Sequence, residues 1–368
     1  MTGGRIWSNI DWWLLVLVMA LAAAGVVNLY SAASSFHTGG NAIYLKQLTW
    51  FSIGLGVMLA VVLIGHQRLA SLAWLIYLLT VAGLVAVLFW GKVMGGSQRW
   101  LAVGPIMVQP SEFARLSIVI ALSHYFARRD PHEPYNLRQL IPPLVMVAVP
   151  AALILKQPDL GTALLLVIIG ASIILVNGVR LASLALMTAP ALPLVIVGWS
   201  FLEDYQKKRI FSFLNPESDP LGSAYHIIQS KIAVGSGELF GKGFMAGTQS
   251  QLHFLPEQHT DFAFSVLAEE WGFVGAMVVL LLMLAIIIRA LYQAWKAKDR
   301  LGMLLVAGAT ACLFWPTLIN VGMLLGLFPV VGIPMPFISY GGSSMITAMA
   351  AIGLIQSVCI HRFIFARK

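Results

Sequence analysis

Residues 12–30 read WWLLVLVMALAAAGVVNLY, and this long, predominantly apolar stretch decides the fold class of the chain. As an α-helix it is about 28 Å long, enough to cross the ~30 Å hydrocarbon core of a bilayer. Trp12 and Trp13 supply aromatic residues typical of a membrane interface. A signal peptide has a shorter apolar core, so the stretch is predicted to be a membrane-spanning helix, although Arg5 precedes it.

The composition of the whole chain agrees with this prediction. Of 368 residues, 59% are hydrophobic and 10% are charged, and the mean hydropathy is +0.85, which excludes a water-soluble globular protein. The net charge of +8 is not gathered into a basic run with interleaved aromatic residues, so nucleic-acid binding is not predicted. Cys312 and Cys359 lie in apolar runs and are expected to be core residues.

The apolar runs predict an all-α integral membrane protein, a bundle of ten transmembrane helices in a single polytopic domain, residues 1–368. Lys and Arg gather in the terminal segments and the even-numbered loops, which indicates that both termini are cytoplasmic. The one large loop, residues 203–261 between the seventh and eighth helices, is then extracytoplasmic. The predicted spans are 12–32, 45–64, 70–90, 110–127, 140–156, 162–178, 182–202, 262–288, 302–328 and 341–360.

A loop as long as 203–261 is uncommon unless it has a function. Within it, residues 224–233 predict a short amphipathic helix that lies along the membrane interface. We expect its apolar residues Ile227, Ile228 and Ile232 to face the membrane.

Carboxylates are the most informative side chains, because a charge near hydrocarbon is unfavourable and usually functional. Glu112, Asp159 and Asp261 each fall at the outer end of a predicted span, so three parts of the chain bring carboxylates to one face. Four others stand beside cytoplasmic cations and are expected to be solvated loop residues: Asp11, Asp130, Glu133 and Asp299.

Asp261 stands where the polar loop runs into the eighth span. Partial desolvation raises the pKa of a carboxyl group, which makes it a stronger base and suits removal of a proton from a sugar hydroxyl. An N-cap role for Thr260 or Asp261 explains the sequence equally well. Glu269 and Glu270, about two turns further along, either support Asp261 or form hydrogen bonds to neighbouring helices.

Two further carboxylates allow a structural and a functional reading. Glu112 and Arg115 are spaced to form an ion pair on one helix face, which either fixes helix packing or belongs to the site. Asp159 follows Pro158 and has the pattern of a turn or cap residue.

Several cations of the outer segments are candidates to bind a pyrophosphate, because guanidinium and ammonium groups suit phosphate oxygens. The alternative is that they are solvated or contact anionic lipid headgroups. The candidates are Arg99, Lys207, Lys208, Arg209, Lys231 and Lys242.

A metal site is not predicted. One group has acceptable zinc ligands, but its spacing matches no metal-binding pattern; it comprises His253, Glu257, His259 and Asp261. A divalent cation, Mg²⁺ or Mn²⁺, stays open as an additional means of neutralising a leaving phosphate.

Ordered motifs over nearly the whole chain resemble those of the SEDS family (shape, elongation, division and sporulation proteins). They lie at 98–100 (QRW), 109–112 (QPSE), 157–161 (QPDLG), 215–222 (NPESDPLG), 255–262 (LPEQHTDF) and 336–344 (PFISYGGSS). The resemblance implies a peptidoglycan glycosyltransferase of the bacterial inner membrane that uses lipid II, extends a growing glycan strand and works with a class B penicillin-binding protein and other elongation-complex membrane proteins.

The resemblance also implies roles for particular residues. Asp261 matches the aspartate required for polymerisation, and Glu112 matches a position important for activity. Where the family often has lysine, this chain has Arg115, which keeps the charge and changes its shape. The other residues expected to bind substrate are Arg99, Asp159, Lys231, Lys242, Glu257 and Ser343.

The two arguments combine into one hypothesis. Asp261 removes the proton from the GlcNAc 4-hydroxyl of an acceptor lipid II, which attacks the anomeric carbon of the donor MurNAc while undecaprenyl pyrophosphate leaves. The reaction would serve cell elongation and rod-shape maintenance. Lipid II translocation is the alternative, since ionisable residues and proline-interrupted spans also occur in transporters. A scaffold that anchors penicillin-binding proteins would leave the carboxylates at the outer rim unexplained.

Overall fold

The computed structural model describes residues 9–34, 40–94, 97–104, 106–129, 134–188, 200, 204–215, 224–252, 254–255 and 257–361. The chain is predominantly helical and divides into two compact units, Met1–Leu69 with Tyr225–Lys368, and Ala70–Ala224. The sequence-based expectation of a single domain stays a prediction. Each of the two units is described by itself.

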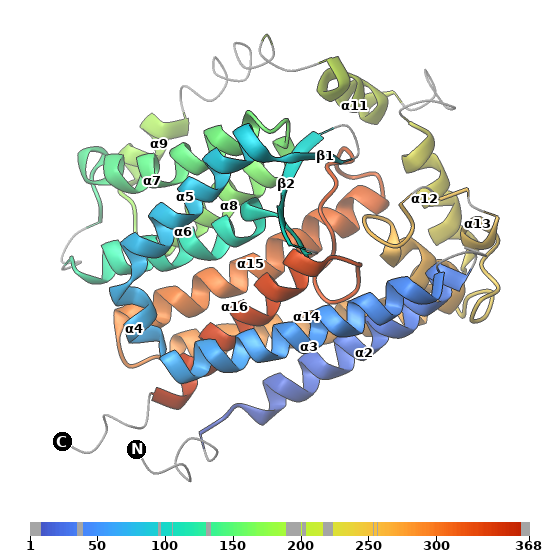
Figure 1. Cartoon of the computed structure of the whole chain (residues 1–368), viewed down its shortest axis with the longest axis horizontal. Coiled ribbons are helices and arrows are strands. Elements are labelled where there is room, and N and C mark those ends of the chain that lie inside the picture. The colour runs from blue at the N-terminus through green and yellow to red at the C-terminus, as the bar shows by residue number, and fades with distance from the viewer. Residues whose placement is uncertain are drawn as a thin grey trace. The chain divides into compact units, whose positions relative to one another are not determined.

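The first unit contains long helices that run side by side (Figure 1). Helix α3 packs along α16, and α14 packs against α2 and α15. The helices are α2 (Trp12–Ser34), α3 (Gly40–Ile64), α4 (His66–Ser71), α12 (Tyr225–Ser236), α13 (Thr248–Gln251), α14 (Ala263–Trp295), α15 (Arg300–Leu324) and α16 (Gly342–His361).

The second unit packs helices around α6, whose side chains are buried along most of its length. Its elements are α5 (Ala73–Trp90), β1 (Lys92–Met94), β2 (Ser97–Val103), β3 (Ile106–Val108), α6 (Pro110–Ala127), α7 (Leu137–Leu155), α8 (Leu160–Val176), α9 (Leu181–Thr188) and α11 (Asp204–Leu214).

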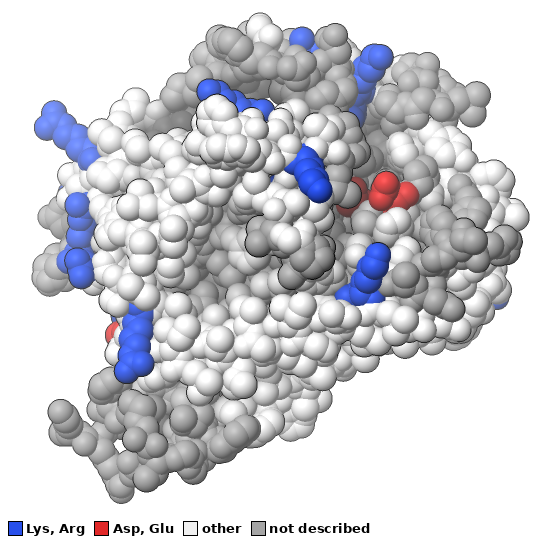
Figure 2. Space-filling view, viewed as in Figure 1, with Lys and Arg blue, Asp and Glu red and all other residues white. Residues whose placement is uncertain are grey.

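Each predicted span except the seventh coincides with a described helix; of 182–202, the described residues are 182–188, in α9, and 200. Seven described helices are long and apolar enough to cross a membrane, and α8 is a shorter apolar helix. The chain is therefore a multi-pass membrane protein. On the face in Figure 2 most of the described surface is uncharged, and the Lys and Arg side chains stand apart from one another.

The prediction of helices alone is wrong for residues 92–108. Here β1, β2 and β3 form an antiparallel sheet in chain order. Met94 pairs with Ser97, and Val103 pairs with Ile106. Such short strands carry little apolar periodicity, so a search for spans passes over them.

Helix α14 is broken at Gly272, where φ is 63° and ψ is −164°. An unbroken helix of 33 residues would be about 50 Å long, well beyond the hydrocarbon thickness, whereas residues 273–295 alone give about 34 Å. A Cβ atom at Gly272 would lie 2.3 Å from the backbone nitrogen of Gly241. Glycine thus allows both the positive φ and the close approach of the preceding loop.

Asp11 is not the solvated loop residue that the sequence suggested, since only 6% of it is exposed. Its Oδ2 accepts hydrogen bonds from Arg289 Nε at 2.8 Å and Gln293 Nε2 at 2.5 Å, and its backbone exchanges two hydrogen bonds with the Gln356 side chain. The start of α2 is thereby fastened to the ends of α14 and α16. Asp299, in contrast, caps α15, and Asp130 and Glu133 lie outside the described residues.

The predicted interfacial helix exists as α12, but its isoleucines do not share one face. Ile227 is buried in the protein, whereas Ile232 is exposed. Helix α12 is held by Ser230, whose hydroxyl bonds to Ser265 at 2.8 Å and to the Leu324 carbonyl at 3.1 Å. The expectation that Ile227 faces the membrane is therefore wrong.

Cys312 and Cys359 are free and buried, as predicted.

Candidate active site

The turn 257–262, which carries Asp261, is fastened to distant parts of the first unit. Gln258 Nε2 donates to the carbonyl of Ala32 on α2 at 2.8 Å. The backbone N–H of Tyr340 donates to the carbonyl of His259 at 2.8 Å. The position of Asp261 is thus set by contacts with residues far away in sequence.

Asn320, a buried amide in the apolar helix α15, holds the Asp261 residue itself. Its Nδ2 donates to the backbone carbonyl of Asp261 at 2.9 Å and to that of Ile333 at 2.8 Å. Asn28 on α2 makes a similar bond, 2.8 Å long, to the carbonyl of Ala263. The sequence signal for these residues is a polar amide inside an apolar span, and neither amide belongs to the motifs that indicated the site.

The Asp261 carboxylate lies partly buried, one residue before the N-cap of α14, which is Phe262. The hydroxyl of Thr260 turns back to Glu257. A Cβ atom at Gly332 would lie 3.3 Å from Asp261 Oδ2, so the carboxylate stands against the backbone of the extended segment after α15.

His259 stands two residues before Asp261. Burial lowers the pKa of His259 below its ordinary value, and the nearby Glu257 carboxylate opposes this shift. Burial thus favours the neutral form of the His259 imidazole.

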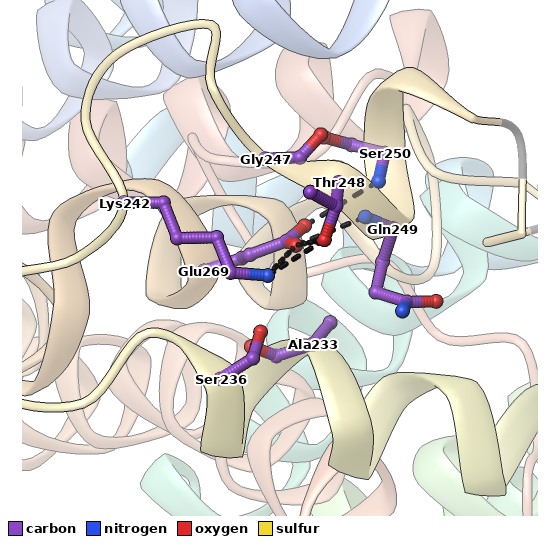
Figure 3. A network of polar contacts seen from close by, with 8 residues as sticks. All are labelled: Ala233, Ser236, Lys242, Gly247, Thr248, Gln249, Ser250 and Glu269. Atoms are coloured by element: carbon purple, nitrogen blue, oxygen red, sulfur yellow. Dashed lines mark hydrogen bonds and ion pairs between the residues drawn. The ribbon is translucent and has the colours of Figure 1, made fainter.

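Glu269 gathers donors from the loop that precedes the turn (Figure 3). Its completely buried carboxylate pairs with Lys242 Nζ at 2.7 Å and accepts the backbone N–H groups of Gln249 at 2.9 Å and Ser250 at 3.3 Å. The Thr248 hydroxyl donates at 3.2 Å. Glu269 thus ties Lys242 and the start of α13 to α14.

Replacing Glu269 with alanine is expected to release this loop. Two backbone donors and the Lys242 ammonium lose their acceptor, and an unsatisfied buried donor costs about 1–3 kcal/mol. We expect trypsin to cleave after Lys242 several-fold faster than in the unmodified protein. Glu238→Gln, an exposed carboxylate of the same loop, should leave the rate unchanged. Equal cleavage in all three proteins would contradict the role given to Glu269.

Glu270, the next residue, points to α2, where Ser31 Oγ donates to its Oε1 at 2.5 Å. Both carboxylates precede the break at Gly272, so they do not lie within the long straight segment that follows. Of the two roles left open by the sequence, the contacts match hydrogen bonding to neighbouring segments.

In the second unit, Glu112 and Arg115 form the predicted ion pair in the first turns of α6. Both side chains are almost fully buried, at 6% and 4% exposure. Isolated charges at such a position would be strongly unfavourable, so each one depends on the other.

Arg99, on β2, holds the turn that precedes α8. Its guanidinium lies 3.4 Å from the Asp159 carboxylate and donates to the carbonyls of Gln157 and Pro158. Asp159 also caps α8 by accepting the Thr162 N–H at 3.1 Å. The prediction that Asp159 is a turn or cap residue is confirmed. The guanidinium of Arg99 is largely engaged by this turn.

The remaining candidates are spread over several elements. Lys231 lies exposed on α12 against the backbone of Gly326. Glu257 is exposed, and Ser343 is buried in the first turn of α16. Among the described residues no group of three or more His, Cys, Asp or Glu side chains can hold a metal ion; His253 lies outside them.

Fold and site together define a multi-pass membrane protein with a partly buried aspartate, whose backbone is held by hydrogen bonds, just before a long apolar helix. The chain belongs to the cell cycle protein family of FtsW, RodA and SpoVE, which it matches over residues 11–363. This is the SEDS family that the sequence motifs indicated.

Relatives extend over almost the full length. MrdB of Escherichia coli K12, a peptidoglycan glycosyltransferase, is 38% identical over 98% of this chain and 96% of its own. RodA of Treponema pallidum, named likewise, is 33% identical over 95% and 98%. The chain is accordingly a glycosyltransferase by enzyme class. A structure describing how a peptidoglycan synthase complex coordinates polymerization and crosslinking covers 96% of this chain and 98% of that one, with 31% identity and a TM-score of 0.82.

Proposed function

We propose that the protein polymerises lipid II into β-1,4-linked glycan strands, with Asp261 as the general base. The observation that carries the proposal is the position of a partly buried aspartate, whose backbone is held by Asn320 within the turn 257–262, in a chain whose relatives are named peptidoglycan glycosyltransferases. A base held by its surroundings in one geometry needs little reorganisation during reaction.

In the proposed step, Asp261 accepts the proton of the GlcNAc 4-hydroxyl of the acceptor. The oxygen forms a bond to the anomeric carbon of the donor MurNAc as the bond from that carbon to the phosphate oxygen breaks. Undecaprenyl pyrophosphate leaves with the electron pair, and Asp261 keeps the proton until it returns to water.

The negative charge on the leaving group needs positive partners. Lys231 is exposed, whereas Lys242 and Arg99 already bind Glu269 and Asp159. Roles in substrate binding for the other candidates remain part of the proposal; these are Glu112, Arg115, Asp159, Glu257 and Ser343. The same holds for a divalent cation, and no step is routed through one.

We also propose the finer topology: ten transmembrane helices in the bacterial inner membrane, both termini cytoplasmic, and 203–261 outside. The bonds between Asp11 and Gln356 support it, since they bring the first and last described helices together at one end.

The proposed partner is a class B penicillin-binding protein, within a complex of elongation proteins that maintains rod shape. The relative solved in a peptidoglycan synthase complex supports this choice.

The direct test is to supply lipid II to the purified protein together with its penicillin-binding partner. Glycan strands of increasing length are expected, with release of undecaprenyl pyrophosphate. Movement of lipid II across vesicles without strand formation would instead favour the translocation alternative and refute the proposal.

A second test uses Gly332, which stands beside the carboxylate with a φ of 70°. In Gly332→Ala, a Cβ atom 3.3 Å from Asp261 Oδ2 crowds the proposed base, and polymerisation should fall several-fold. Gly178→Ala is the control. Its φ of 81° imposes a similar backbone strain, which costs about 1–2 kcal/mol, but the new Cβ atom meets open space. Equal losses in the two variants would assign the effect to strain instead of the contact with Asp261.

A further inference from the structure

Two large apolar side chains of the loop after α12 are turned away from the protein. Leu239 is 61% exposed and Phe240 is 80% exposed. Phe244 and Met245, a few residues further on, are also exposed. Adjoining apolar side chains of this size usually mark a surface that meets a partner or a membrane. We call residues 238–245 the strap.

Hydrogen bonds fix the strap to the break in α14. The carbonyl of Glu238 accepts the N–H of Phe273 at 2.8 Å, and that of Leu239 accepts the N–H of Val274 at 3.0 Å. Further along the strap, the N–H of Gly243 donates to the carbonyl of Glu270 at 3.0 Å. Leu239 and Phe240 are therefore held level with the first residues of the long straight segment of α14.

Close packing of backbones reinforces these bonds. A Cβ atom at Gly241, where φ is 81°, would lie 2.1 Å from the carbonyl oxygen of Glu270. One at Gly237, just before the strap, would lie 2.0 Å from the carbonyl oxygen of Ala268. The strap thus lies directly on α14 and keeps its level relative to that helix.

Helix α14 indicates where that level falls in a bilayer. Tyr292 and Trp295 mark one interface, and about twenty residues of helix cross the hydrocarbon, which places the other edge near Gly272. An exposed apolar stripe begins at this edge and runs along the helix: Phe273, Val274, Val278, Leu281, Leu284 and Ile288. Through its bonds to residues 273 and 274, the strap continues this stripe.

Helix α2 gives the same level independently. Trp12 and Trp13 lie at one end and Tyr30 at the other, about 27 Å apart along the helix. Phe244 of the strap stacks on Tyr30 with ring centroids 6.4 Å apart and lies 6.2 Å from Trp271 of α14. Aromatic rings gathered at one depth are typical of a membrane interface.

We propose that Leu239, Phe240 and Phe244 insert into the bilayer at the boundary between headgroups and acyl chains, so that the strap is a membrane anchor of the large loop. In the proposed topology this is the outer leaflet. Lipid is the occupant because the exposed residues are continuous with the apolar stripe of α14 and with the aromatic rings at the end of α2. This proposal rests on the exposure of the strap side chains and on their level along α14 and α2, and it does not rest on the proposed reaction.

The test measures the depth of a spin label at position 240. Phe240→Cys is made in the full chain with Cys312→Ala and Cys359→Ala, labelled with a nitroxide and placed in nanodiscs of phosphatidylethanolamine and phosphatidylglycerol. Val278→Cys serves as the lipid-facing standard, and Lys298→Cys, exposed between α14 and α15, serves as the aqueous standard. Collisions with oxygen report lipid, and collisions with a water-soluble nickel chelate report water.

The ratio of oxygen to nickel collisions at position 240 should approach that at 278 and exceed that at 298 several-fold. A ratio like that of the aqueous standard would overturn the proposal. Low collision rates with both reagents would do so as well, since they would mean that protein covers the strap. Cysteine at a position as exposed as 240 leaves the packing intact, and the protein with Cys312→Ala and Cys359→Ala alone is the folding control for the two buried replacements.

Discussion

Asp261→Asn is expected to lower glycan polymerisation by about 10²- to 10⁴-fold, the usual contribution of a positioned general base. Asparagine has nearly the shape of aspartate, so the turn 257–262 has room for it. The bond from Asn320 uses the backbone carbonyl of residue 261 and survives the change. Strand formation from lipid II by equal amounts of folded protein measures the effect.

The control for Asp261→Asn is Glu238→Gln, which removes a carboxylate from the same large loop without touching the turn. Its polymerisation rate should equal that of the unmodified protein. Equal rates for Asp261→Asn and the unmodified protein would end the assignment of the base. A matched loss in both variants would indicate a general dependence on loop charge.

Arg115→Ala is expected to destabilise the second unit by about 3–5 kcal/mol, because it leaves the buried Glu112 carboxylate without its cation. The measurement is the midpoint of thermal or denaturant unfolding in detergent. Arg115→Lys keeps the charge and should lose much less, although an ammonium cannot reproduce the planar guanidinium contact.

A double variant separates the structural from the functional role of this pair. Glu112→Gln with Arg115→Met removes both charges and should recover much of the stability lost in Arg115→Ala. If the double variant folds and stays inactive, the pair also serves the reaction. A double variant no more stable than Arg115→Ala would show that an unpaired carboxylate is not the cause of the loss.

Most of the helical architecture could be predicted because a span is a local property. The stretch 12–30 is apolar except for Asn28, and α2 covers it. The sheet at 92–108 was missed because its strands are short and their pairing depends on a turn. The break at Gly272 was missed for a related reason. The sequence of α14 does not distinguish Gly272 from other glycines, because the break depends on packing against the strap, which is distant in sequence.

The candidate site was predicted in part. The sequence located Asp261 at the junction of loop and helix and left its role open between base and cap. Glu112 with Arg115 was predicted from helical spacing alone and is confirmed as an ion pair. Asp11 was misjudged because its partners, Arg289 and Gln356, are hundreds of residues away.

Hydropathy, charge and spacing alone told us that this chain lies in a membrane and which carboxylates stand near its edges, because each depends only on neighbouring residues. Folding in three dimensions decided which side chain meets which: Asn320 with Asp261, Glu269 with the start of α13, and Gly241 with the broken helix. Burial and hydrogen bonding join residues distant in sequence, so no local pattern contains them.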